Sequence, residues 1–266
     1  MTGQHMDMGS ASMASYLVPW LLVAVLLGAY VFAVLQQQRA GKQWSRWRTA
    51  SFILGCSLLV IAMAPGLAQY AHHDLRGHMV QHLLVGMLAP LGLVLAAPVT
   101  LALRTLPVSA ARSITALLKS RPVHWLGHPV PALLLNIGGM YLLYLTPLYT
   151  LTLTNPFLHH LVHAHFLLAG CLFVWAIAGP DFNPNRAGKY TRLAVLFVSM
   201  AAHAYLSKFM YAYVWPRNTP HDVAQIQEAA QLMYYGGDFA ELLLVIAFFA
   251  SWYQRRNPHA FKLQPV

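Results

Sequence analysis

The chain has 266 residues, of which 58% are hydrophobic and only 9% are charged. Soluble domains contain about a quarter charged residues, so this composition excludes a conventional soluble enzyme. The net charge is +10, but the basic residues form short clusters between apolar stretches. That distribution is typical of the loops of a membrane protein and excludes a nucleic-acid-binding face.

Seven apolar stretches follow one another along the chain, each long enough for a membrane helix of about 20 residues. They cover approximately residues 16–37, 50–70, 78–103, 131–150, 157–178, 190–214 and 229–253. Residues 107–121 have apolar side chains on one helix face and basic ones on the other, which predicts an interfacial helix. We therefore expect an all-α bundle of seven transmembrane helices over residues 16–255, between two tails, 1–15 and 256–266.

Lys and Arg are distributed unevenly over the loops. Fourteen of the 17 follow the first, third, fifth and seventh stretches, and the opposite loops contain only Arg76 and Arg217. Because basic loops stay in the cytoplasm, this distribution predicts a cytoplasmic C-terminus and an N-terminus outside. An odd number of spans agrees with that orientation.

The 14 histidines gather on the side that this orientation places outside. Three lie on the cytoplasmic side and His203 lies near the middle of the sixth span. The other ten are in outer loops or outer halves of spans, and imidazole is the commonest metal ligand. They are His5, His72, His73, His78, His82, His159, His160, His163, His165 and His221.

Two pairs of these histidines have the spacing of one helical turn. His78 and His82 are four residues apart at the outer start of the third span, and His159 and His163 repeat the spacing in the fifth. Residues four apart share a helix face, so each pair can present two nitrogens to one transition-metal ion. The candidate metal ligands are His78, His82, His159, His163, His160 and Met79.

The ligand types favour copper. The only cysteines, Cys56 and Cys171, are far apart and form no CxxC pair. Copper handling would therefore depend on His, Met and carboxylate groups, and thioether and imidazole ligands suit copper(I). The N-terminal tail contributes a loose set of such groups: His5, Met6, Met8 and Met13.

Charged residues inside the sixth and seventh spans form a second candidate site. Ionisable groups within a membrane are costly and usually paired or lining a cavity. At 1.5 Å per residue, Lys208 and Asp238 lie at similar depths and Asp238 shares a face with Glu241. We expect an intramembrane polar seam between these spans, serving either helix packing or a metal or proton path. Its members are His203, Lys208, Asp238 and Glu241.

Several segments resemble one known family. Residues 78–84 read His-Met-Val-Gln-His-Leu-Leu, residues 95–98 Leu-Ala-Ala-Pro, and residues 235–238 Tyr-Gly-Gly-Asp, followed by Glu241. Over roughly residues 50–255 the chain resembles the CtaG-type cytochrome c oxidase assembly factor family. Further segments that carry the resemblance are His128-Pro129, Asn155-Pro156 with His159 and His163, and Trp175 with Gly179-Pro180-Asp181.

The resemblance implies a function. It implies a multi-pass protein of the bacterial inner membrane, not an enzyme, that helps to mature haem–copper oxidases at the copper step. Oxidase subunits are then the expected partners, with periplasmic copper chaperones as further candidates and copper as the bound metal.

Three alternatives stay open. A copper permease would need a continuous polar path, which the polar seam could supply. A membrane di-iron oxygenase would use the His-x-x-x-His and His-His-x-x-His clusters, although such clusters normally face the cytoplasm. A haem b protein would need paired axial histidines deep in two spans, for which His203 and His165 are the candidates.

Overall fold

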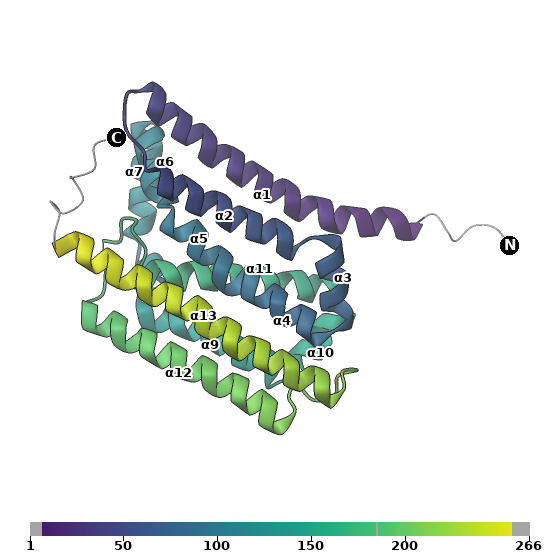
Figure 1. The fold of residues 1–266 in the computed structure, drawn as a ribbon. Helices are drawn as coiled ribbons and strands as arrows, with labels where there is room; N and C mark the ends of the chain where they lie inside the picture. The colour runs from purple at the N-terminus through teal and green to yellow at the C-terminus, as the bar shows by residue number, and fades with distance from the viewer. Residues whose placement is uncertain (1–6, 185, 257–266) are drawn as a thin grey trace.

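The computed structural model describes the backbone of residues 7–184 and 186–256 and the side chains of residues 17–184 and 186–253. The His/Met side chains of the N-terminal tail and the C-terminal tail lie outside these ranges. The described residues are helical with no strand (Figure 1), which confirms the all-α prediction. The first half contains α1 (Asp7–Arg39), α2 (Arg46–Ala62), α3 (Pro65–His73), α4 (Leu75–Leu83), the π-helical turn η1 (Leu84–Leu88), α5 (Ala89–Leu95) and α6 (Pro98–Thr105). The second half contains α7 (Val108–Leu118), α8 (Arg121–Leu126), α9 (Pro129–Tyr144), α10 (Leu148–Thr154), α11 (Pro156–Ile177), α12 (Lys189–Tyr213) and α13 (Val223–Arg256).

Five helical segments are long and apolar enough to cross a membrane. They are Leu17–Arg39, Leu75–Thr105, Pro156–Ile177, Lys189–Tyr213 and Val223–Tyr253. Two further segments are bent pairs: α2 and α3 meet at 55°, and α9 and α10 at 75°. The described residues therefore give five to seven spans, and each of the seven predicted stretches corresponds to one segment or one bent pair. Both bends coincide with a proline, Pro65 and Pro147, and proline cannot supply the N–H that continues a helix.

The third predicted span is continuous but irregular. It runs from α4 through η1 into α5, with Pro90 in the first turn of α5. Pro90 has no N–H to return to the carbonyl of Gly86 one turn earlier, which accounts for the wider π-helical turn at this point. The segment packs tightly, because a Cβ atom on Gly92 would lie 2.9 Å from Gly55 of α2. This span forms the centre of the bundle.

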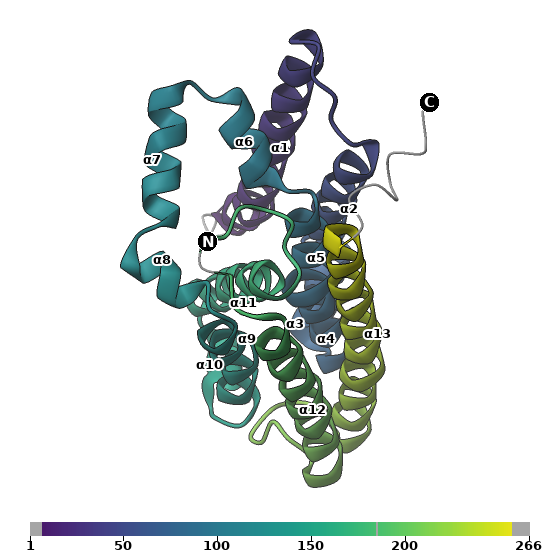
Figure 2. The ribbon, with the colours of Figure 1, turned by 90° about the vertical axis from the view of Figure 1, so that its left-hand side faces the viewer.

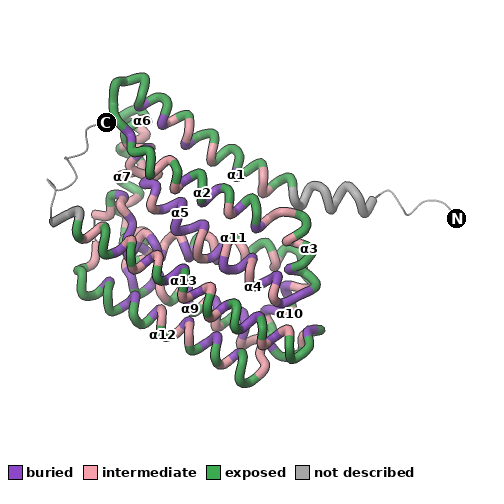
Figure 3. The backbone as a smooth tube through the Cα atoms, viewed as in Figure 1, coloured by how far each residue is buried: buried purple, intermediate pink, exposed green. Residues whose placement is uncertain are grey.

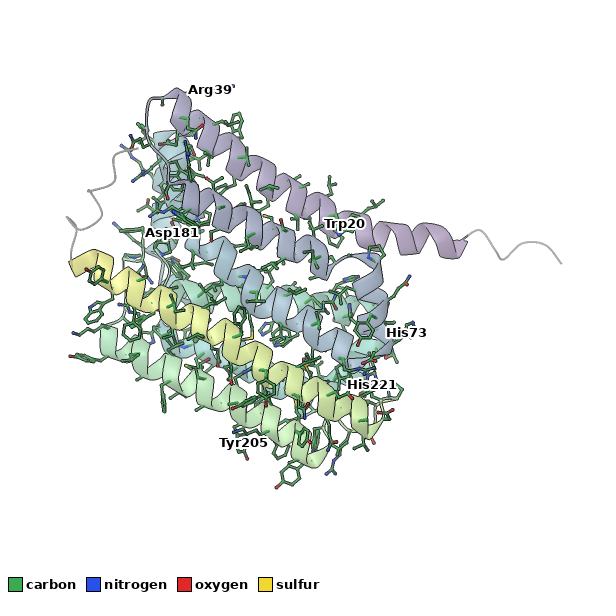
Figure 4. All side chains as sticks on the ribbon, viewed as in Figure 1. Trp20, Arg39, His73, Asp181, Tyr205 and His221 are labelled. Carbon is green, nitrogen blue, oxygen red and sulfur yellow. The ribbon has the colours of Figure 1, made fainter. Side chains whose placement is uncertain are left out.

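The two ends of the bundle differ in chemistry. His73 and His221 lie at one end, which we call the histidine end, and Arg39 and Asp181 lie at the other, which we call the basic end (Figure 4). The first turn of α1 and the last turn of α13 lie at opposite ends (Figure 1). The uneven distribution of basic residues and histidines along the sequence therefore corresponds to two chemically different ends of the helix bundle.

At the basic end, α6 packs against α1, and from there α7 and α8 form an arch that stands out from the other helices (Figure 2). The predicted helix over residues 107–121 is α7, and it has no buried residue. The α6 end of the arch is tied to the bundle by Asp181, whose carboxylate accepts hydrogen bonds from the backbone N–H of Val99 (3.2 Å) and Thr100 (2.6 Å). The position of α7 at a membrane surface stays a prediction.

The outer surface of the bundle is strongly apolar. From Leu17 on, most side chains of α1 are exposed, whereas α4 and α5 are largely buried (Figure 3). Large hydrophobic side chains point outward, for example Leu21 (66% exposed) on α1 and Phe197 (72%) on α12. Such an extended apolar surface suits a lipid environment and agrees with a membrane protein.

Candidate functional site

The histidine end begins with a charged corner between α3 and α4. Asp74 caps α4: its carboxylate accepts from the backbone N–H of Arg76 at 2.8 Å. The Arg76 guanidinium pairs with Asp74 and also donates to Glu228 of α13 at 2.7 Å. Hydrogen bonding from Arg76 lowers the pKa of Asp74 below its ordinary value. The corner thereby fixes the start of α4, and with it the histidines that follow, against α13.

His78 and His82 both point into the bundle. Each side chain is 4% exposed, and the Nε2 atom of each is buried without a hydrogen-bond partner. The ring of His78 lies among aromatic rings, 5.0 Å from Tyr149 and 6.1 Å from Tyr144 between centroids. The ring of His82 packs on Phe166 at 4.9 Å. Buried polar atoms are normally paired, so two unpartnered imidazole nitrogens one turn apart are unusual for a protein interior.

The second predicted pair, on α11, lies next to the first. The ring centroids of His159 and His163 are 4.3 Å apart, and His163 lies 6.1 Å from His78. Both nitrogens of His163 are engaged, however. Its Nδ1 lies 2.9 Å from the carbonyl oxygen of His159 and its Nε2 lies 3.0 Å from Oε1 of Gln81. His163 can therefore bind a metal only after Gln81 moves.

The other two predicted ligands lie in contrasting environments, one exposed and one in the core. His160 is exposed and lines a groove between α1 and α11 with Val18 and Leu22. Met79 is fully buried, and the hydroxyl of Tyr144 donates to its Sδ at 3.6 Å.

Among the described residues, no three His, Cys, Asp or Glu side chains are already arranged around one metal position. The structure brings both predicted pairs together. On α4, the Nε2 atoms of His78 and His82 have no partner, whereas on α11 both nitrogens of His163 face acceptors and His159 is partly exposed. His72 extends the cluster on its outer side, with a centroid 6.0 Å from His159. The described residues thus form a row of ring contacts from His72 through His159 and His163 to His78.

The predicted polar seam is divided between two environments. His203 is fully buried against Gly237, and neither of its ring nitrogens has a hydrogen-bond partner. Glu241 is 4% exposed and also has no partner. Lys208 instead lies on the exposed side, with Nζ 5.1 Å from the ring centroid of Tyr234. Among the described residues, Lys208 forms no ion pair with Asp238. The rotation of α12 about its axis turns the lysine side chain outward.

Sequence reasoning missed two polar contributors, Gln81 and Tyr149. Gln81 lies inside the His-Met-Val-Gln-His segment and connects α2 to α11. Tyr149 donates to or accepts from Nε2 of His221 at 2.9 Å, and His221 is 9% exposed, not a water-exposed residue of the membrane interface. Burial lowers the pKa of His221, so its ring is neutral near pH 7. The signals available were a glutamine between two candidate ligands and a tyrosine two residues after Pro147.

Comparison with known protein families assigns the sequence of this chain to one family. A family model described as the cytochrome c oxidase caa3 assembly factor matches residues 28–255, most of the chain. The chain belongs to this family. The resemblance that the sequence carries is thereby confirmed, and the matched region includes every described residue of the histidine cluster and the seam.

The similar curated proteins are named as uncharacterised and do not identify an activity. An uncharacterised protein of Mycobacterium bovis is 36% identical over 188 residues, which are 68% of this chain and 28% of the relative. An uncharacterised protein of Mycobacterium leprae is 35% identical over 190 residues, 68% of this chain and 29% of the relative. The chain thus spans less than a third of the length of these relatives. No solved structure matches it.

Proposed function

We propose that this protein takes up copper at the histidine end and delivers it to a cytochrome c oxidase during assembly. The assembly role is the one that the family suggests. The copper step, the delivery and a non-enzymatic mode of action are our proposal. By the positive-inside rule the histidine end faces outward from the bacterial inner membrane, with oxidase subunits and periplasmic copper chaperones as partners.

The observation that carries the proposal is the pair of unpartnered nitrogens, Nε2 of His78 and Nε2 of His82. Burying a polar atom without a partner is unfavourable by roughly 1–3 kcal/mol. A metal ion that binds both nitrogens would relieve that cost twice. Imidazole suits copper, and the adjacent thioether of Met79 favours the copper(I) state.

The arrangement of His159 and His163 on α11 supports transfer of a copper ion more than its storage. His163 is held by Gln81 and by the His159 carbonyl, so it becomes a ligand only by exchanging one of these hydrogen bonds. His159 and His72 continue the row toward the surface of the histidine end. A donor must release its ion, and a site with exchangeable neutral ligands releases copper more readily than a closed thiolate cage.

The layer beneath the site argues for a delivery protein over a permease. Closest to the basic end, the interior between α11, α12 and α13 is filled by apolar side chains of one cluster, including Ile177, Val195, Leu196 and Phe248. An ion in that layer would lose its hydration with no polar replacement. The polar groups at the histidine end therefore favour exchange with the outer side.

A di-iron oxygenase finds less support. Two iron ions need several ligands around a common centre, which the His-x-x-x-His and His-His-x-x-His clusters would have to supply. The described residues contain no group of three such side chains positioned around one ion. The carboxylates near the histidines, Asp74 and Glu228, are occupied by Arg76.

The test is copper binding by the purified full-length chain in lipid nanodiscs. We expect one tight copper(I) per chain, lost in the double variant His78→Ala/His82→Ala. His73→Ala provides a matched control, because His73 is an exposed histidine at the same end. Unchanged stoichiometry in the double variant would contradict the proposal. The same sample separates the alternatives, since bound haem has a characteristic optical spectrum and metal analysis distinguishes iron from copper.

A further inference from the structure

A small cavity lies deeper in the bundle than the histidine cluster. Its volume is about 30 Å³, and its walls come from η1, α5, α9, α11, α12 and α13. A water molecule needs at least about 10–15 Å³ of such space, so the cavity has room for one ion or one or two waters. Most of its lining is apolar, and the polar side chains that line it are Asn136, Ser199 and Glu241.

Glu241 is the unusual member of this lining. Its side chain is 4% exposed and both carboxylate oxygens are buried without a hydrogen-bond partner. An isolated carboxylate in an apolar interior is strongly unfavourable. The group must therefore be neutralised, either by a proton or by a cation in the cavity that it lines.

The other donors are oxygen atoms as well. Asn136 on α9 and Ser199 on α12 are 6% and 2% exposed and contribute an amide and a hydroxyl. Gly86 lines the same cavity from the π-helical turn, where Pro90 supplies no N–H to its carbonyl. Oxygen donors select hard cations over copper(I), which prefers sulfur and nitrogen.

The charge of the residues that line the cavity determines which cation charge the cavity can hold. Glu241 is the only ionisable residue among those that line the cavity. A monovalent cation would bring the site to neutrality, whereas a divalent ion would leave a net positive charge in an apolar environment. The site therefore fits a small monovalent cation.

We propose that Glu241, with Asn136 and Ser199, forms a binding site for one small monovalent cation in the interior of the bundle. The two candidate cations are a sodium ion and a proton. The site uses none of the proposed copper ligands, so this proposal does not depend on whether the protein delivers copper.

The titratable residues nearest to the cavity along η1, α12 and α13 lie on the side of the histidine end. His82 lies one turn before Gly86, His203 one turn after Ser199, and Asp238 three residues before Glu241. Toward the basic end, Arg192 is buried and donates to the carbonyl of Ile177 at 2.9 Å. The residues of α9 and α11 that line the cavity include no titratable group. A cation thus meets imidazoles on the histidine side and an apolar layer on the other.

The experiment uses the full-length protein in nanodiscs and two readouts. Binding of radioactive sodium ion is measured at alkaline pH against a choline background. The infrared band of a protonated, buried carboxyl group is measured at neutral pH without sodium. Glu241→Gln keeps the size of the side chain and removes the charge, and Asp238→Asn is the control on the same helix.

If sodium is the ligand, binding is lost in Glu241→Gln and retained in Asp238→Asn. If the proton is the ligand, sodium does not bind and the carboxyl band is lost in Glu241→Gln alone. Asn136→Leu keeps the test valid should Glu241→Gln not fold. It would lower sodium affinity about tenfold or more, or shift the carboxyl band. Absence of both sodium binding and a Glu241 carboxyl band would overturn the proposal.

Discussion

Oε1 of Gln81 lies 3.0 Å from Nε2 of His163, while the amide group of the same glutamine donates to the carbonyl of Ala62 at 2.8 Å. The second bond fixes the orientation of the amide, so an oxygen faces the imidazole. Because Nδ1 of His163 also faces a carbonyl oxygen, both ring nitrogens meet acceptors. A neutral imidazole has one N–H and satisfies only one of them. His163 is therefore held in an arrangement that a proton, or a metal after Gln81 turns away, would satisfy better.

Replacing Gln81 by leucine should release His163. We expect copper to bind about five- to tenfold more tightly, the equivalent of one hydrogen bond of about 1 kcal/mol. The same change should lower the stability by roughly 1–3 kcal/mol, because the buried carbonyl of Ala62 loses its donor. Copper titration against a competing chelator and thermal unfolding measure the two effects. Adding His163→Ala should cancel the gain in affinity; a gain that persists would show that His163 is not a ligand.

The corner of Asp74 and Arg76 should give the protein a specific acid sensitivity. The pKa of Asp74 is lowered by Arg76, so the charged carboxylate stabilises the fold at pH values above its unfolded pKa of about 4. That contribution is lost as the pH falls through the lower folded pKa. Asp74→Asn should remove the acid sensitivity and lower stability near neutral pH by up to about 1 kcal/mol. Melting curves over a pH series measure it, with Glu228→Gln as the control at the exposed partner. Parallel curves for Asp74→Asn and the unchanged protein would contradict the assignment.

Gly237 should be the most sensitive glycine of α13. A Cβ atom there would overlap the ring of His203, which has no space to move in the core. Gly237→Ala should therefore lower stability by about 1–3 kcal/mol through overpacking. Gly28→Ala is the matched control, because nothing lies within 4 Å of its added Cβ and alanine favours the helix. Equal melting temperatures for the two variants would argue against the packing of His203 on α13.

The orientation of the chain is testable directly. The basic end should face the cytoplasm, as loops rich in Lys and Arg do. A reporter that is active only in the cytoplasm should be active when it is fused after Val266. A reporter active only outside should be inactive at the same position. The reverse result would place the histidine end inside the cell and remove the basis for delivery to an outer copper site.

The helical architecture follows from the sequence because hydropathy and helical spacing are local properties. The seven stretches and the shared face of His78 and His82 needed no tertiary information. The bends at Pro65 and Pro147 did, since a bent helix and a straight one have the same hydropathy. The outward position of Lys208 also depends on how α12 is rotated, whereas counting residues gives only its depth. The bond between Tyr149 and His221 joins residues 72 positions apart, and no spacing rule reaches that far.

The most direct test of the account is the copper content of the oxidase itself. The oxidase would be purified from cells that contain this protein, from cells that lack it, and from cells that carry His78→Ala/His82→Ala. We predict normal oxidase polypeptide and haem in all three, with copper depleted in the second and third and partly restored by added copper. His73→Ala should leave the oxidase fully loaded. Normal oxidase copper in the cells that lack the protein would contradict copper delivery.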